Sequence, residues 1–237
     1  MNKELIKSRF KKHLASYEKN AVVQKIMAEK LVNLCSGKYY KRILELGCGT
    51  GTLTKLANSL LEFDSYVAID IVDECESFLK AINPKISFKS CDIESFELNE
   101  YDLIISNAAL QWVDNFDNTV NKIISAINSP GEFIFSTVGK ENLREIYNIV
   151  GIGLNYCSET ELKEKFPAIS ECLQEIYVMS FDSPKEVLEH LRYTGVNAIE
   201  NRPWTKADLT AFENAYNALC IAKPTLTYNP VYIKIVK

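Results

Sequence analysis

The chain has 237 residues, of which 47% are hydrophobic and 24% are charged, and its formal net charge is −4. This composition supplies enough apolar material for one large core and excludes a disordered chain. No apolar run approaches the ~18–20 residues that a membrane-spanning helix needs, and no apolar stretch follows the basic N-terminus as it would in a signal peptide. The seven cysteines show neither regular spacing nor a CxxC pair, so we expect a reducing cytoplasm and neither a disulfide framework nor a metal site.

Residues 1–41 are predicted to form a helical arm. Apolar side chains recur at helical spacing from Phe10 to Leu34, and Gly37 ends the pattern, which indicates one bent helix or two short ones. Residues 1–42 also hold eleven Lys and Arg against three Glu, whereas the rest of the chain is acidic. A basic arm is compatible with an acidic partner or with a solvated helix face, and it does not indicate nucleic acid when the whole chain is acidic.

Residues 42–140 alternate between short apolar runs and helical patterns. The predicted strands are Arg42–Leu46, Tyr66–Asp70, Ile86–Ser90, Tyr101–Asn107 and Glu132–Thr137. The predicted helices between them are Thr52–Leu61, Val72–Ala81 and Asn118–Asn128. Strands that alternate with helices form βαβ units, so we expect a doubly wound, mostly parallel α/β sheet.

The remaining segment, 141–237, has a different pattern, in which helices lie between two closing strands. Ser158 and Ser183 each begin a capping-box pattern, and Thr205 is placed to cap a further helix. The predicted strands are Gln174–Phe181 and Leu226–Val236. We expect a single domain over the whole chain, with a substrate-side half that carries a helical lid at about residues 183–220.

The main functional motif of the sequence is a glycine-rich loop. Gly47, Gly49 and Gly51 follow the first predicted strand and open a helix. Glycine lets the backbone turn sharply and approach a ligand, and a helix N-terminus offers free N–H groups to an anion. Asp70 ends the next predicted strand, where its carboxylate is placed to hold two ribose hydroxyls. Loop, helix and carboxylate in this register predict a nucleotide-binding site rather than merely a tight turn.

The glycine spacing indicates which nucleotide binds. A dinucleotide site has the spacing GxGxxG and an uncharged loop, whereas this loop reads GxGxG and Glu45 lies just upstream. A carboxylate there repels phosphate but suits a ligand that carries an ammonium and a sulfonium. S-adenosyl-L-methionine has both groups and no phosphate, so it is the expected cofactor. A dinucleotide-dependent oxidoreductase is the alternative from another class.

This pattern resembles that of class I methyltransferases, which implies a Rossmann-like fold with a seven-stranded sheet. Cys91-Asp92-Ile93 resembles the acidic motif that reaches the adenine amine, and Ser106–Trp112 resembles the segment beside the methyl group. The alternative roles are a helix cap for Asp92 and a core aromatic for Trp112. Asn107 is followed by Ala108-Ala109-Leu110 and not by a pair of prolines, which disfavours methylation of nucleic-acid amines or protein amides. The expected cofactor-binding residues are Glu45, Gly47, Gly49, Gly51, Asp70, Ile71, Asp92, Ile93 and Asn107.

Outside this common core, the chain resembles one family, the malonyl-[acyl-carrier protein] O-methyltransferases (BioC), over most of its length. The resemblance is carried by Phe10…Tyr17-Glu18…Ala21-Val-Val-Gln24, Ile43–Gly51, Ser106–Asp114, Phe135-Ser136-Thr137, Leu143-Arg144-Glu145, His190–Ala198 and Leu226–Tyr232. One departure is Phe10-Lys-Lys-His-Leu14, where members often read Phe-Ser-Arg-Ala-Ala. The resemblance implies methylation of the free carboxylate of a malonyl thioester, on acyl carrier protein or coenzyme A, for biotin synthesis.

No general base is expected, because a carboxylate acceptor is already ionised at pH 7. The predicted catalytic residues therefore position the substrate. Tyr17 and Trp112 are expected as walls of the methyl-transfer pocket, and Arg144 is expected to bind the malonyl carboxylate, with Arg192 as second choice. An arginine suits this role because its planar fork binds a carboxylate bidentately. A surface salt bridge is the alternative for either arginine.

The acidic carrier protein is expected to meet the basic arm, through Lys3, Lys7, Arg9, Lys11 and Lys12. Neither nucleic acid nor a membrane is expected as a partner, and a monomer is favoured.

Two alternatives remain open for the function itself. One is a methyltransferase for another small carboxylic acid or for a phenolic or quinone acceptor, and the other is a binding protein without turnover.

Overall fold

The computed structural model describes residues 2–195, 204–220 and 222–237. A seven-stranded sheet has the strand order β3-β2-β1-β4-β5-β9-β6, in which β9 is antiparallel to both of its neighbours and the pairs from β3 to β5 are parallel. In that order the strands are β3 (Ser87–Ser90), β2 (Glu62–Asp70), β1 (Tyr39–Leu46), β4 (Tyr101–Asn107), β5 (Ile127–Val138), β9 (Pro230–Val236) and β6 (Ile169–Gln174). The doubly wound α/β fold predicted from the sequence is confirmed.

Helices cover both faces of this sheet, because side chains along each strand alternate between two cores. On β1, Ile43 packs in the first core and Leu44 and Leu46 pack in the second. Helices that cover the first core are α2 (Val22–Asn33), α3 (Thr52–Leu60) and α4 (Cys75–Ile82). The second core is covered by α5 (Phe116–Ser125) and α7 (Glu159–Lys165).

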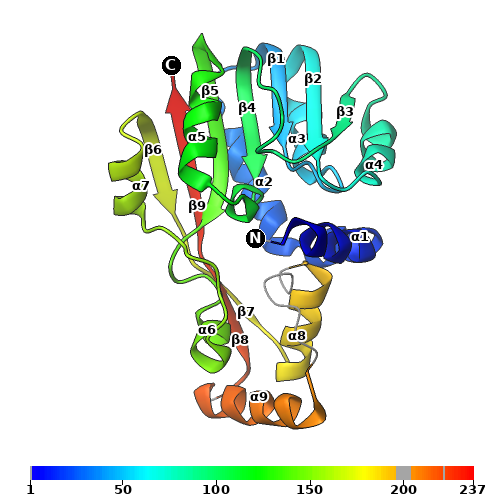
Figure 1. Cartoon of the computed structure of the whole chain (residues 1–237), viewed down its shortest axis with the longest axis vertical. Coiled ribbons are helices and arrows are strands. Elements are labelled where there is room, and N and C mark those ends of the chain that lie inside the picture. The colour runs from blue at the N-terminus through cyan, green and yellow to red at the C-terminus, as the bar shows by residue number, and fades with distance from the viewer. Residues whose placement is uncertain (1, 196–203, 221) are drawn as a thin grey trace.

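The arm forms two helices, and the first of them, α1 (Lys3–Asn20), crosses the carboxyl ends of β1, β2 and β4 (Figure 1). Asn2 caps α1, since its side chain accepts the N–H of Leu5. Beyond α1, Figure 1 shows a smaller layer built from the antiparallel pair β7–β8 and three helices. These elements are β7 (Tyr177–Ser180), β8 (Thr225–Tyr228), α6 (Arg144–Val150), α8 (Pro184–Tyr193) and α9 (Lys206–Leu219). The helices α8 and α9 lie within the predicted lid segment, whereas the predicted subdivision of the domain stays a prediction.

Both predicted closing strands are divided between the two sheets, which the sequence pattern did not reveal. The division falls at Asn229, whose side chain is fully buried. Its Nδ2 donates to the carbonyl of Glu175 at 2.7 Å, and its Oδ1 accepts from Nε2 of Gln174 at 3.0 Å. These bonds hold the chain at the point where it leaves one sheet for the other. Most of β6 and all of α6 were also not predicted.

The predicted helix caps are mostly confirmed. Ser158 and Thr205 form complete capping boxes with Glu161 and Asp208. Ser183 caps α8, but the carboxylate of Glu186 accepts the N–H of Asp182 instead of that of Ser183, so the predicted box is incomplete. Among the residues that the structure describes, no helix is long and apolar enough to cross a membrane.

Candidate functional site

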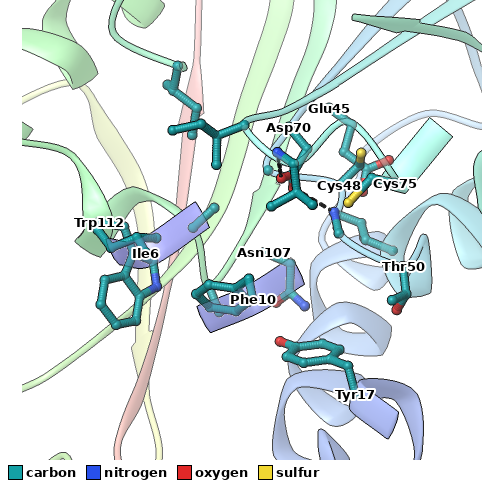
Figure 2. A pocket seen from close by; sticks show the side chains of 18 of the residues that line it. Ile6, Phe10, Tyr17, Glu45, Cys48, Thr50, Asp70, Cys75, Asn107 and Trp112 are labelled. Carbon is teal, nitrogen blue, oxygen red and sulfur yellow. Dashed lines mark hydrogen bonds between the residues drawn. The ribbon is translucent and has the colours of Figure 1, made fainter. Parts of the chain in front are cut away.

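A pocket lies at the carboxyl ends of β1, β2 and β4, and α1 closes it from outside (Figure 2). This edge of an open α/β sheet is where ligands bind. Every cofactor residue predicted from the sequence lines the pocket or its glycine loop, and so do Tyr17 and Trp112.

The glycine loop needs glycine for two different reasons. Gly47, Gly49 and Gly51 all have positive φ angles, of 72°, 53° and 83°. A Cβ on Gly47 would clash with Ala109, and one on Gly51 would clash with Ile82. A Cβ on Gly49 would meet no atom within 4 Å, so this residue leaves room for a ligand to approach the backbone.

Asp70 links β2 to the glycine loop. Its Oδ2 accepts the N–H of Gly49 at 2.9 Å, and its Oδ1 accepts the N–H of Val72 at 2.9 Å (Figure 2). Burial raises the pKa of Asp70, and the two backbone N–H groups work against that shift. Each carboxylate oxygen still has acceptor capacity for a ligand hydroxyl.

Glu45 lies beneath the loop and is only 1% exposed. Its Oε2 accepts hydrogen bonds from Thr54 Oγ1 at 2.7 Å and from the Tyr66 hydroxyl at 2.6 Å. Burial raises the pKa of Glu45 to about 7, against the lowering effect of these two bonds. A cation in the pocket would favour the ionised form, whereas a phosphate would be repelled.

The adenine side of the predicted site is formed by Asp92, with Ile71 and Ile93 among the lining residues. Asp92 does cap a turn, because its Oδ1 accepts the N–H of Glu94 at 3.0 Å. It also forms an ion pair with Lys3 of α1, at 3.1 Å. The cap predicted as an alternative role therefore exists, and the same carboxylate lines the pocket.

Asn107 joins three elements at the end of β4. Its Nδ2 donates to the carbonyl of Gln24 in α2 at 2.9 Å, and its Oδ1 accepts from the Ser136 hydroxyl at 2.8 Å. Both ends of the amide are thus bonded within the protein. Asn107 shapes the pocket floor by holding α2 against β4 and β5.

Three aromatic side chains form the wall opposite the loop. Phe10 lies between Trp112 and Tyr17, with ring-centroid distances of 5.8 Å and 6.1 Å (Figure 2). Trp112 is half-buried and faces the pocket, so the alternative of a purely core aromatic does not describe it. Burial raises the pKa of Tyr17, and its hydroxyl has no hydrogen-bond partner among the described residues.

Arg144 does not reach this pocket. It begins α6, lines a second cavity between α6, α8 and α9, and lies 3.2 Å from Glu141 and 3.9 Å from Glu145. Two other arginines, Arg9 and Arg192, line the same cavity. Arg144 follows β5 as predicted, but it begins α6, and α6 packs against β8 and α9 in the smaller layer.

The lysines of the arm are engaged within the chain. Lys3 pairs with Asp92 and Glu94, Lys7 lies 3.1 Å from Asp73, and Lys11 pairs with Glu74. Three of the five basic residues expected to receive the carrier protein therefore hold α1 over the pocket.

Two polar residues of the pocket, Gln24 and Thr50, were not among the predicted cofactor-binding residues. Gln24 Oε1 and Thr50 Oγ1 are buried there without a hydrogen-bond partner. A buried polar atom without a partner is costly, which indicates that a ligand satisfies it. Thr50 could have been found from its place in the glycine loop, and Gln24 from its place in the motif Ala21-Val-Val-Gln24 that resembles the family. The open Gly49, the carboxylates and these unpaired oxygens fit a cationic nucleoside without phosphate.

Comparisons with known proteins show which family the chain resembles. A family described as methyltransferase domain matches residues 38–195. Malonyl-[acyl-carrier protein] O-methyltransferase from Chlorobium luteolum is 36% identical over 247 residues, which cover 98% of this chain and 94% of that protein. The protein of the same name from Calditerrivibrio nitroreducens is 34% identical, with 98% of this chain and 96% of that protein covered.

A solved structure supports the fold alone. N-methyltransferase NodS from Bradyrhizobium japonicum WM9, in complex with S-adenosyl-L-homocysteine, is 14% identical, covers 98% of each chain and has a TM-score of 0.57. The fold is that of class I methyltransferases, in agreement with the strand order and the pocket at the sheet edge. From its full-length relatives and the matching domain, the chain belongs to the family of malonyl-[acyl-carrier protein] O-methyltransferases.

Proposed function

We propose that this enzyme transfers a methyl group to the free carboxylate of a malonyl thioester on acyl carrier protein, and that the methyl ester serves biotin synthesis. One observation carries the proposal: relatives that bear this activity in their name align with 98% of the chain. The methyl donor is S-adenosyl-L-methionine. We place the reaction in the cytoplasm and expect a monomer.

The pocket supports this cofactor through its charge pattern. We assign the methionine part to the loop Gly47–Gly51, the ribose hydroxyls to Asp70 and the adenine amine to Asp92. Ile71 and Ile93 would flank the adenine. Glu45 would favour the positive charge of the ligand, and the unpaired oxygens of Gln24 and Thr50 are available to its polar groups.

The cofactor supplies an electrophilic methyl group on a positively charged sulfur. When bound, it would give this methyl group to a carboxylate oxygen of the acceptor, which would form the O–C bond with its lone pair while the C–S bonding pair stayed with sulfur. No proton moves, which is consistent with a pocket wall of Phe10, Tyr17 and Trp112 in place of a general base. Those aromatic side chains would exclude water and hold the acceptor in line, which can supply several kcal/mol.

Arg144 and Arg192 are assigned to the carrier side of the reaction. Both line the second cavity with Arg9, and among the described residues no carboxylate lies within ion-pair distance of Arg192. A thioester on acyl carrier protein hangs from a phosphopantetheine arm, which bears a phosphodiester. Guanidinium groups bind phosphate well, so we assign this cavity to the arm.

The test is incubation of the protein with S-adenosyl-L-methionine and malonyl-acyl carrier protein, followed by intact-mass measurement of the carrier. The malonyl carrier should gain one methyl group, and an acetyl carrier, which lacks the free carboxylate, should gain none. Malonyl-coenzyme A, tested in parallel, measures the contribution of the carrier. Methylation of a small phenol or of another carboxylic acid, with none on the malonyl carrier, would overturn the proposal.

A further inference from the structure

The helices α1 and α8 pack together along a seam that borders both cavities. On α1, Phe10 lines the cofactor pocket, and its neighbour Arg9 lines the second cavity. On α8, Leu191 and Arg192 line the second cavity, and Gly195, just beyond the end of the helix, lies against the Phe10 ring. The seam therefore joins the wall of the cofactor pocket to the cavity that we assign to the arm of the carrier.

The backbone at position 195 requires a glycine for two reasons. The φ angle of Gly195 is 74°, in the left-handed region that favours glycine and that commonly ends a helix. A Cβ at this position would lie 2.9 Å from Cε1 of Phe10 and 3.0 Å from its Cδ1 and Cζ. These distances are shorter than van der Waals contact, so the seam has no room for even one more methyl group.

The end of α8 is held in place by buried hydrogen bonds. Nε2 of His190 lies 2.7 Å from the hydroxyl of Tyr228 in β8, and Tyr228 is 3% exposed. The Thr194 hydroxyl donates to the carbonyl of His190 at 2.9 Å, and Thr194 is 1% exposed. Because the residue before Gly195 is fixed in this way, the helix end does not give way easily to a larger side chain.

The Phe10 ring is also confined by the other aromatic residues of the pocket wall (Figure 2). Its centroid lies 5.8 Å from that of Trp112, at an interplanar angle of 85°, and 6.1 Å from that of Tyr17. Edge-to-face packing of this kind favours one orientation of the ring. A Cβ at position 195 would therefore displace a ring that lines the cofactor pocket and packs on two further residues of its wall.

We propose that Gly195 is a positioning residue for methyl transfer, and that it acts by fixing the ring of Phe10. This inference rests on the proposed function, because it concerns how the malonyl carboxylate is placed opposite the methyl group. The carboxylate oxygen has to lie in line with the methyl carbon and the sulfur. A misplacement of about 1 Å can lower the rate by about a hundredfold, so a shifted wall residue is enough to impair the reaction.

The experiment compares Gly195→Ala with Gly151→Ala as a matched control. Gly151 follows α6 with a φ of 68°, but a Cβ there would meet no atom within 4 Å. Both changes strain the backbone, and only the first adds a clash. Gly195→Ala should lower kcat/KM for the malonyl carrier by about ten- to a hundredfold, mainly through kcat, whereas Gly151→Ala should stay within about twofold. The affinity for S-adenosylhomocysteine, measured by calorimetry, should fall much less than kcat/KM in Gly195→Ala.

Two further variants separate the clash from the backbone strain. Leucine lacks the outer ring atoms of Phe10, so in a Phe10→Leu background Gly195→Ala should cost no more than Gly151→Ala does. The effects of Phe10→Leu and Gly195→Ala on kcat/KM should therefore be far from additive, as for residues in direct contact. Asparagine tolerates a positive φ but carries a Cβ, so Gly195→Asn should lower kcat/KM at least as much as Gly195→Ala.

The outcomes distinguish this inference from the proposed function. If the unaltered enzyme does not methylate the malonyl carrier, the proposed function fails. If it does, but Gly195→Ala behaves like Gly151→Ala, the contact with Phe10 does not position the acceptor and the inference is overturned. A loss in Gly195→Ala that persists undiminished beside Phe10→Leu, or that S-adenosylhomocysteine affinity follows in parallel, reflects a general defect of the fold and overturns it as well.

Discussion

The ammonium of Lys3 lies 3.1 Å from Oδ2 of Asp92, and this ion pair ties the first turn of α1 to the loop after β3. The same ammonium lies 2.7 Å from Glu94, whose carboxylate also accepts the N–H groups of Asp114 and Asn115. Lys7 and Lys11 continue this face of α1 at four-residue spacing. We call Lys3, Lys7 and Lys11 the latch, because they hold α1 over the cofactor pocket.

Removal of the latch should loosen the arm without unfolding the sheet. An exposed ion pair is worth ~0.2–1 kcal/mol, so the triple change of the latch lysines to Gln should speed hydrogen exchange in α1 by roughly three- to a hundredfold. The affinity for S-adenosylhomocysteine should fall in parallel, and added salt should mimic the change. Lys19→Gln, at the exposed end of α1, is the control. Unchanged exchange in the triple variant would show that apolar packing alone closes the arm.

Asp70→Ala should abolish tight cofactor binding. A hydrogen bond to a charged group is worth ~1.5–3 kcal/mol, and the ribose offers two hydroxyls, so we expect a loss of about a hundredfold or more. Calorimetry with S-adenosylhomocysteine measures this loss. Asp64→Ala, an exposed change on the same strand, should leave the affinity unchanged. Unchanged binding in Asp70→Ala, or tighter binding of a nicotinamide dinucleotide, would contradict the assigned site.

Glu45 should make stability depend on pH. Its pKa is about 7 in the folded chain against 4.5 in the unfolded one, so the folded state binds more protons between these values. The contribution to stability is therefore full below pH 4.5 and is lost as the pH rises through 7, by roughly 3 kcal/mol. Glu45→Gln should flatten this profile in urea titrations without cofactor, whereas the exposed Glu62→Gln should not.

Binding should show the opposite trend at Glu45. A positively charged ligand favours the ionised carboxylate, so the affinity for S-adenosyl-L-methionine should rise between pH 5.5 and 8. The neutral product should show a smaller rise. Equal pH dependence for the two ligands would mean that Glu45 does not sense the charge of the cofactor.

Arg144→Lys and Arg192→Lys should raise the KM for the malonyl carrier several-fold while cofactor affinity stays intact, because both arginines line the second cavity. Salt should raise the KM for the carrier more than that for malonyl-coenzyme A, since screening acts over ~8 Å at physiological strength. Arg42→Lys is the control, because Arg42 packs 5.0 Å from the Tyr101 ring at the far end of the strands. Normal kinetics in both variants would remove the carrier role from this cavity.

The sequence predicted the features that are local in the chain. The glycine loop, Glu45 and Asp70 could be recognised because their spacing in sequence sets their spacing in the site. The strand β6 was largely missed because none of its six side chains is buried, so it lacks the apolar run of a core strand. The start of α6 depends on a distant bond, from the N–H of Leu143 to the carbonyl of Thr227 at 2.7 Å. Such contacts leave no local pattern.

The partners of the charged residues in the arm also could not be predicted from local sequence. A basic segment in an acidic chain indicated an acidic partner, and that partner is in part the loops after β2 and β3 of the same chain.

The central claim is that the acceptor atom is a carboxylate oxygen. The most direct measurement uses S-adenosyl-L-methionine with a labelled methyl group, followed by mild alkaline hydrolysis of the methylated malonyl carrier. An O-methyl ester should release its label as methanol, with the carrier polypeptide left unlabelled. Label that stays on the acyl group or on the carrier polypeptide after hydrolysis would show methylation at carbon or nitrogen, and would contradict the account.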